Sequence, residues 1–164
     1  MCEDGTNCNH TAAHTEYDKA LKRAFWTDFQ NRIRRSCNDL LPFARVWQHI
    51  QTVEHKALGL DHIALDDIVG SDGRYRDFDL TFLPRRRELD DRWVNVAQAH
   101  YEGIQLPPVR LYKVGEAYYV MDGNHRVSVA RVLGLDSVQA AIVEIDPQNL
   151  IPDPNCKRSG YKLT

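Results

Sequence analysis

The chain has 164 residues, and its 21 basic and 23 acidic residues give a formal net charge of −2. A chain of about 150 residues can bury roughly two-thirds of its unfolded surface, so one domain with its own core is expected. The charge argues against a domain that binds DNA through overall positive charge. No apolar run approaches the about 18 residues of a membrane span, and the first residues lack the pattern of a signal peptide. We therefore expect a cytoplasmic protein with no membrane partner.

Residues 1–14 are predicted to be a flexible tail. Four side chains that can bind zinc occur there: Cys2, Cys8, His10 and His14. Their spacing matches no common pairing of Cys and His ligands, so a zinc site is not expected.

Residues 15–60 are predicted to form a helical extension of two packed helices. A period of four residues predicts one buried face, made of Leu21, Phe25, Phe29 and Ile33. The second helix is predicted to run to Leu58 and to end at Gly59, with candidate core residues Leu40, Ala44, Trp47, Ile50 and Val53. The basic residues of the first helix, above all Arg32, Arg34 and Arg35, form either a solvated face or a surface for DNA.

Residues 61–146 alternate between strand and helix signals, which predicts an α/β (α+β) domain with a small mixed sheet. The predicted strands are 62–69, 78–82, 109–114, 117–121 and 138–145. Helices are predicted from about Glu88 to Tyr101, with Leu89, Trp93, Val96 and His100 on the buried face, and over the segment that Gly134 closes. All three tryptophans, Trp26, Trp47 and Trp93, are assigned to the core, and residues 147–164 to a tail.

The segment Asp122-Gly123-Asn124-His125-Arg126 lies between a predicted strand and a predicted helix. Glycine lets the backbone approach a ligand, and the amides that follow lie at a helix N-terminus, where unpaired N–H donors favour phosphate. Arg126 can bind phosphate in two places and His125 can donate a hydrogen bond or move a proton. Asp122 could hold Mg²⁺ or cap the helix. Together these residues predict an anion site for phosphate.

This segment and its flanks resemble the ParB/sulfiredoxin superfamily from about Ile63 to Ile145. The resemblance lies in the proline-led strand PPVRLYKV, the strand AYYVMDG, the His-Arg dipeptide and the helix VSVARVLG. It implies a bacterial-type, ParB-like protein with the superfamily's small mixed sheet, whose loop contacts nucleotide phosphates through Gly123, Asn124, His125 and Arg126. The implied ligand is CTP or ATP with Mg²⁺ at Asp122, bound and in one alternative hydrolysed, with Asp122 and His125 as candidate catalytic residues.

Departures from the family's patterns separate the alternatives. Sulfiredoxins have a cysteine in this loop where this chain has Asn124, so sulfinic acid reduction is not expected. Free serine kinases of this type have a catalytic glutamate before the helix that precedes the proline-led strand, where this chain reads PRRREL and Glu88 is the nearest acid. A small-molecule phosphotransferase therefore stays an alternative.

Two further predictions concern the surface around this loop. Arg85 and Arg86, with Arg87 and Arg92, are predicted to complete the phosphate site, or else to pair with acidic neighbours on an exposed helix start. A DNA-binding or adaptor module without catalysis stays a second alternative, and a homodimer is a further possible assembly. A ParB-like nuclease would need a set of carboxylates, and Asp66, Asp67, Asp72 and Asp79 are interpreted as solvated instead.

Overall fold

The computed structural model describes residues 5–34, 38–47 and 53–147. The helices are α1 (Gly5–Arg34), α2 (Phe43–Trp47), α3 (Asp90–Tyr101) and α4 (Asn124–Val132), with short 3-10 turns η1 (Leu65–Asp67) and η2 (Arg87–Leu89). The strands are β1 (Leu41–Pro42), β2 (Val53–Ala64), β3 (Ile68–Ser71), β4 (Val109–Val114), β5 (Ala117–Asp122) and β6 (Ser137–Pro147). In the described part of the chain, no helix is long and apolar enough to cross a membrane.

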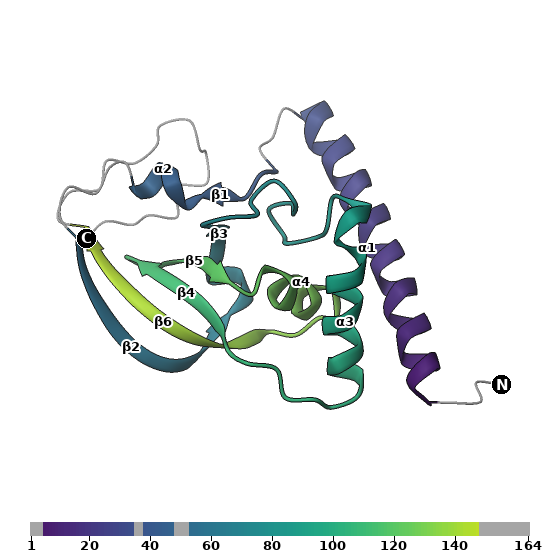
Figure 1. Cartoon of the computed structure of the whole chain (residues 1–164). Helices are drawn as coiled ribbons and strands as arrows, with labels where there is room; N and C mark the ends of the chain where they lie inside the picture. Colours follow the sequence, from purple (N-terminus) through teal and green to yellow (C-terminus); the bar gives the residue numbers. More distant parts are fainter. Residues whose placement is uncertain (1–4, 35–37, 48–52, 148–164) are drawn as a thin grey trace.

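The six strands form one mixed sheet in the order β1-β3-β5-β4-β6-β2. The neighbours β4 and β5 are antiparallel, as are β2 and β6, whereas β4 and β6 are parallel, as are β3 and β5. Helix α4 packs between the sheet and α3, and α1 lies along the outer side of α3 (Figure 1). The predicted α/β class and mixed sheet are confirmed.

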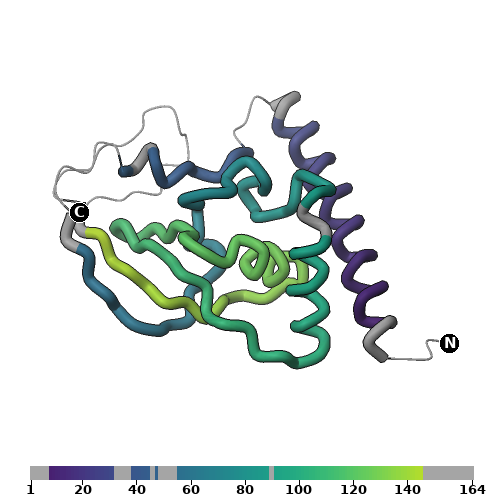
Figure 2. The backbone as a smooth tube through the Cα atoms, viewed as in Figure 1, coloured from purple at the N-terminus to yellow at the C-terminus, as the bar shows by residue number. Residues whose placement is uncertain are grey.

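The main core lies between the sheet and the helices. Its largest fully buried side chains include Trp93 of α3, Tyr17 of α1, and Phe78 and Phe82 of the segment between β3 and α3. Figure 2 shows this segment folded back on itself between the sheet and α1. This packing places the segment next to the start of α4, where the rings of Phe78 and His125 lie edge to face with centroids 5.5 Å apart.

The N-terminal prediction was wrong in three respects. Helix α1 begins at Gly5, so most of the predicted tail is helix. Its buried face is made of Ala13, Tyr17, Ala20 and Ala24, whereas Phe25 and Phe29 are 66% and 49% exposed. The small alanines let α1 pack closely on the domain, Ala20 and Ala24 against Leu83, and a period of large side chains does not reveal such a face. Trp26 and Trp47 are also exposed, and of the three tryptophans only Trp93 is in the core.

The second predicted helix is mostly strand. Helix α2 ends at Trp47, and the chain from Val53 to Ala64 forms β2 along β6. Gly59 does adopt a left-handed φ of 92°, but at a β-bulge and not at a helix end. Leu40 is buried as predicted and Ala44 is exposed, while Ile50 lies outside the described residues.

The predictions for the rest of the domain were closer. Helices α3 and α4, the hairpin β4–β5 and the final strand β6 are confirmed. On α3, Trp93 is buried, Val96 half-buried and His100 exposed. The predicted strand 78–82 is instead a turn with isolated bridges at Phe78 and Asp79.

Candidate functional site

The loop between β5 and α4 has the strand-glycine-helix form that the sequence predicts. Strand β5 ends at Asp122, Gly123 follows with φ 104°, and α4 begins at Asn124. A Cβ on Gly123 would lie 2.8 Å from Cγ1 of Val109 and 3.0 Å from Nη2 of Arg126. Both the left-handed backbone and the close approach of β4 therefore require glycine here.

The N-terminus of α4 has no side-chain cap. Its first helical hydrogen bond runs from the Val127 N–H to the Gly123 carbonyl, at 3.0 Å, and the residue before the helix offers no side chain to accept from the amides. The N–H groups of Asn124, His125 and Arg126 precede that first bond, so they have no intrahelical acceptor. Such a group of donors, at the positive end of the helix dipole, favours an anion.

Two side chains of the first turn have buried polar atoms without a partner among the described residues. Asn124 is 8% exposed and its Oδ1 accepts no hydrogen bond. Both ring nitrogens of His125 are also buried and have no hydrogen-bond partner among these residues. Buried polar groups are normally hydrogen-bonded, so these atoms mark a place where a ligand or water can bind.

The His125 imidazole is held in its neutral form. Its pKa is lowered to about 4, mainly by burial and further by the positive charges of Arg74 and Arg92, against a smaller opposing effect of Asp77. A neutral imidazole keeps one nitrogen as donor and one as acceptor at pH 7. His125 can therefore donate to a phosphate oxygen or accept a proton from a nucleophile.

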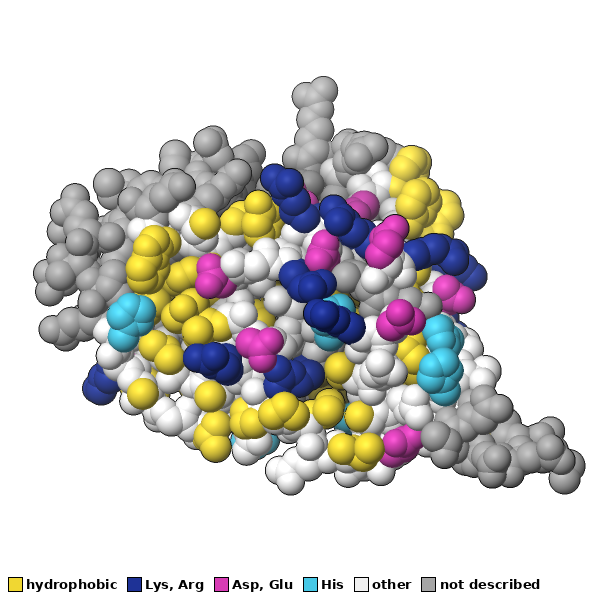
Figure 3. All heavy atoms as spheres, in the orientation of Figure 1, with side chains coloured by type: hydrophobic (Ala, Val, Ile, Leu, Met, Phe, Trp, Pro, Cys, Tyr) yellow, Lys and Arg dark blue, Asp and Glu magenta, His cyan; other side chains and the backbone are white. Residues whose placement is uncertain are grey.

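Arginines from two other segments lie near His125. Arg74 follows β3, and its guanidinium is 3.6 Å from the Asp77 carboxylate, while Arg86 lies 3.5 Å from the same carboxylate. Arg92 lies on the first turn of α3 and is exposed. In Figure 3, Lys and Arg side chains gather with Asp and Glu around a histidine in the middle of the face shown. We call Arg74, Arg86 and Arg92 the arginine group; Asp77 pairs with the first two of them.

Sequence reasoning missed Arg74 and Asp77. They lie about 50 positions before the loop in the printed sequence, in a segment with no motif of its own. Only the fold of residues 72–86 brings them beside α4, so no local pattern could have identified them.

Arg126 is used largely within the protein. Its Nη1 donates to the carbonyls of Pro107 and Pro108, the second at 2.8 Å, and its Nη2 donates to Asp122 Oδ2 at 2.7 Å. These bonds fix the loop against the chain that enters β4. They occupy three of the five guanidinium donors, which limits the two-point grip on phosphate that the sequence suggests.

The structure places the other predicted residues in different surroundings. Arg85 donates to Asp28 at 2.8 Å, to Asp39 at 2.7 Å and to the Asn38 carbonyl at 2.6 Å, so its guanidinium ties α1 to neighbouring segments. Glu88 is exposed in η2. Arg86 belongs to the arginine group, whereas Arg85 is bound to its own partners.

Metal ligands are sparse in the described residues. No group of three His, Cys, Asp or Glu side chains comes together there, and Cys2 lies outside the described residues. Asp122 is the one carboxylate of the loop itself; it is largely exposed, with one oxygen bound to Arg126. Mg²⁺ is often held by one or two carboxylates together with substrate phosphates, so Asp122 fits a magnesium ion that arrives with a nucleotide.

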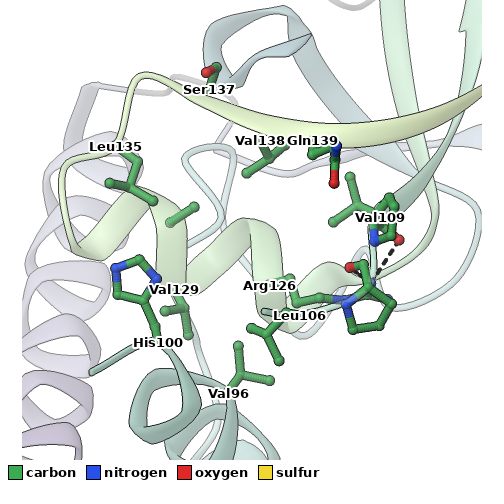
Figure 4. A pocket seen from close by; sticks show the side chains of 13 residues that line it. Val96, His100, Leu106, Val109, Arg126, Val129, Leu135, Ser137, Val138 and Gln139 are labelled. Atoms are coloured by element: carbon green, nitrogen blue, oxygen red, sulfur yellow. Dashed lines mark hydrogen bonds between the residues drawn. The ribbon is translucent and has the colours of Figure 1, made fainter. Parts of the chain in front are cut away.

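A pocket of about 200 Å³ lies along the flank of α4, beside Arg126 (Figure 4). Apolar side chains from α3, α4, the proline-led segment and β6 line it, with His100, Ser137 and Gln139 at polar positions. The volume is below the about 300–1,000 Å³ of usual small-molecule sites. We assign no ligand group to it.

No protein-family model and no curated protein matches the chain. Its structure is similar to the crystal structure of sulfiredoxin from Arabidopsis thaliana, with 21% sequence identity and a TM-score of 0.38. The similarity covers 53% of this chain and 86% of that one. No function follows from a similarity at this level.

Proposed function

We propose that this protein binds a nucleoside triphosphate, CTP or ATP, with its phosphates at the N-terminus of α4. The observation that carries the proposal is the uncapped first turn of α4, where both ring nitrogens of His125 are buried without a partner among the described residues. An anion there would accept from free amides at the positive end of the helix.

The surrounding charges support an anionic ligand. Burial is the main cause of the lowered pKa of His125, and the positive charges of Arg74 and Arg92 add to it against the opposing Asp77. The positive charges of these two arginines favour an anion near the imidazole. A triphosphate would offset that charge, and in this proposal it accepts from the amides after Gly123 and from the arginine group. Arg126 then positions the loop, through Asp122 and the proline carbonyls, instead of serving as the main phosphate ligand.

Magnesium has a defined role in this proposal. Asp122 would be its protein ligand from the loop, and the ion would screen the charge of the phosphates. Hydrolysis would require a base for the attacking water. In this proposal that base is His125, whose neutral imidazole lies at this end of the helix. Nucleotide binding does not depend on turnover, so the two are measured separately.

The proposal is tested by thermal unfolding with CTP, ATP, GTP and ADP, each with and without Mg²⁺. A ligand at about a hundred times its dissociation constant adds about 2.7 kcal/mol, which is a rise of a few degrees for a chain of this size. The expected result is a rise with one triphosphate that Arg74→Ala with Arg92→Ala reduces to the level of the buffer.

A matched control is Arg76→Ala. Arg76 is in the same loop as Arg74, but its guanidinium lies over the Tyr75 ring, 5.5 Å from the centroid. This variant should keep the full nucleotide response. A flat response to all four nucleotides would refute the proposal, as would a rise that the loss of Arg74 and Arg92 leaves unchanged.

A further inference from the structure

Strand β2 is at the edge of the sheet, with β6 as its one neighbour in the described part of the chain (Figure 1). All residues from His55 to His62 are exposed, including Leu58 at 42% and Leu60 at 62%. An edge strand has unpaired backbone N–H and C=O groups along its outer side, which is a template for pairing with another strand. In this segment the His62 N–H already donates to Asp61 Oδ1 at 2.7 Å. Exposed leucines on such an edge favour its pairing with another strand, because pairing removes their apolar surface from water.

A one-residue bulge divides β2 into two arms. Ala57 is opposite Val143 and Gly59 is opposite Ile142, so Leu58 is the extra residue. Since side chains alternate along β6 and directly opposed residues share a face, the register fixes the faces of both arms. Lys56 and Asp61, opposite Glu144 and Ala140, share one face.

The same register puts four residues on the other face. Ala57, Leu60 and His62 are opposite Val143, Ala141 and Gln139, and His55 is opposite Ile145. His55 and His62 therefore share the face of Ala57 and Leu60. Positions on β2 can be counted by the β6 residues opposite them, and Gly59, opposite Ile142, is then the midpoint between the two arms. Each paired residue of one arm has a counterpart on the other arm, at an equal number of β6 residues from Ile142 and on the same face.

We propose that β2 pairs antiparallel with β2 of a second copy of this chain, about a two-fold axis at Gly59. In this register Lys56 of each copy is opposite Asp61 of the other, Ala57 is opposite Leu60, and His55 is opposite His62. Gly59 is opposite its own counterpart, where neither copy has a side chain and the space beyond the backbone is open to 4 Å. The two sheets become continuous. This assembly is independent of the proposed nucleotide site.

The charges select a second copy over an unrelated strand. A lysine on an edge strand normally discourages pairing, but here the symmetry sets it against an aspartate. Because the interface is isologous, the Lys56–Asp61 contact occurs twice in the dimer. Opposite charges directly across a strand pair stabilise it and like charges destabilise it.

The assembly is measured by sedimentation velocity and light scattering of the full chain. The paired segment, residues 55–62, is shorter than the roughly 20–30 residues per side of a standard interface. We therefore expect a weak dimer, whose fraction increases with the protein concentration over a range up to about 500 µM.

Charge reversals test the register. Lys56→Glu alone and Asp61→Lys alone each create two like-charge contacts, and each should weaken the dimer by about tenfold or more. The double variant Lys56→Glu, Asp61→Lys restores opposite charges and should recover most of the affinity. Lys22→Glu on the exposed surface of α1 is the matched control and should change nothing.

Three outcomes would overturn the proposal. One is a chain that stays a monomer at every concentration. Another is a dimer that both single reversals leave intact, because it would use a different face. The third is a double variant no better than the single ones, because Lys56 would then not be opposite Asp61. Circular dichroism of each variant confirms that the exposed substitutions leave the fold unchanged.

Discussion

The indole Nε1 of Trp93 donates a hydrogen bond to Oγ of Ser128 at 2.9 Å, and both residues are fully buried. The bond joins the first turn of α3 to the middle of α4. Since α3 also bears Arg92 and α4 begins at the phosphate-site candidate, this pair holds the two helices that meet at the site in a fixed relation. It is a polar contact between two side chains that are otherwise surrounded by the apolar core.

Ser128→Ala should destabilise the protein by about 1–3 kcal/mol, because the indole N–H would stay buried without an acceptor. The free energy of unfolding in urea measures this loss. In Trp93→Phe with Ser128→Ala, the serine substitution should cost much less, since no donor remains to be left unpaired. An equal cost of Ser128→Ala in both backgrounds would show that the hydrogen bond contributes nothing.

The sequence predicts the second half of the fold better than the first. The hairpin β4–β5, the helix after Gly123 and the last strand follow from local signals that agree with the tertiary structure. Strand β2 does not, because its strand form depends on pairing with β6, some 80 residues away in the printed sequence. Gly59 was identified as a special backbone position, but a bulge and a helix end need the same conformation.

Residues 78–82 show a second limit of pattern reasoning. Phe78, Leu80 and Phe82 alternate as in a strand, yet Asp79 is fully buried and its Oδ1 accepts from the Thr81 amide, the Thr81 hydroxyl and the Leu83 amide. An aspartate that accepts from backbone amides just ahead of it favours a turn over a strand. The prediction that Asp79 is solvated was wrong, because this turn buries its carboxylate and supplies its hydrogen-bond donors.

The candidate site was predictable only where its residues are contiguous. The loop from Asp122 to Arg126 was identified from its composition and its place between strand and helix. Arg74 reaches the site through the fold alone, and the internal bonds of Arg126 and Arg85 depend on partners distant in sequence. The basic side chains of residues 32–37, assigned to a possible DNA surface, lie outside the described side chains.

Arg85→Ala should reduce stability without reducing nucleotide binding. The guanidinium bridges Asp28 of α1, Asp39 and the Asn38 carbonyl, and its hydrogen bonds with the two carboxylates raise its pKa while burial opposes this. Losing these half-buried contacts should cost about 1–3 kcal/mol. Urea unfolding and nucleotide titration are measured on the same variant.

Arg87→Ala is the matched control for Arg85, because Arg87 is exposed at the next turn. It should change the free energy of unfolding by no more than about 0.5 kcal/mol. If Arg85→Ala abolished nucleotide binding while the protein stayed folded, Arg85 would belong to the phosphate site after all.

His125 should make stability fall as the pH drops. Its pKa is about 4 in the folded protein against an ordinary 6.5, so both states are neutral above pH 7 and the stability contribution is constant there. Between these two values the unfolded chain binds a proton that the folded protein does not, and stability is lost as the pH falls. At pH 4 the loss should reach about 2–3 kcal/mol.

The loss is isolated by comparing the wild-type protein with His125→Asn, which does not titrate, in urea at pH 7, 5.5 and 4. As the pH falls, the unfolding free energy of the wild-type protein should decrease more than that of His125→Asn. Parallel pH dependence of both proteins would mean that His125 is accessible to protons in the folded state.

Gly123→Ala separates backbone strain from steric contact at the candidate site. The added Cβ would meet Cγ1 of Val109 at 2.8 Å and the Arg126 guanidinium at 3.0 Å, in a residue with φ 104°. We expect a loss of about 2–4 kcal/mol in unfolding free energy, the sum of a strained backbone and displaced neighbours. Gly115→Ala, at φ 59° with nothing within 4 Å, adds only backbone strain and should cost about 1 kcal/mol.

The excess of the first loss over the second contains the close approach of β4 to the loop and the greater backbone strain at φ 104° than at φ 59°. Val109 is buried, so Val109→Ala is itself destabilising, but it should cost less in the Gly123→Ala background than in the wild-type protein, because it removes one of the two contacts. The Arg126 contact stays, so the guanidinium should still shift from the Pro107 and Pro108 carbonyls, and the loop should bind nucleotide more weakly. If Gly123→Ala reduced the unfolding free energy no more than Gly115→Ala does, the contacts with Val109 and Arg126 would not exclude a Cβ. The requirement for glycine would then rest on the backbone conformation alone.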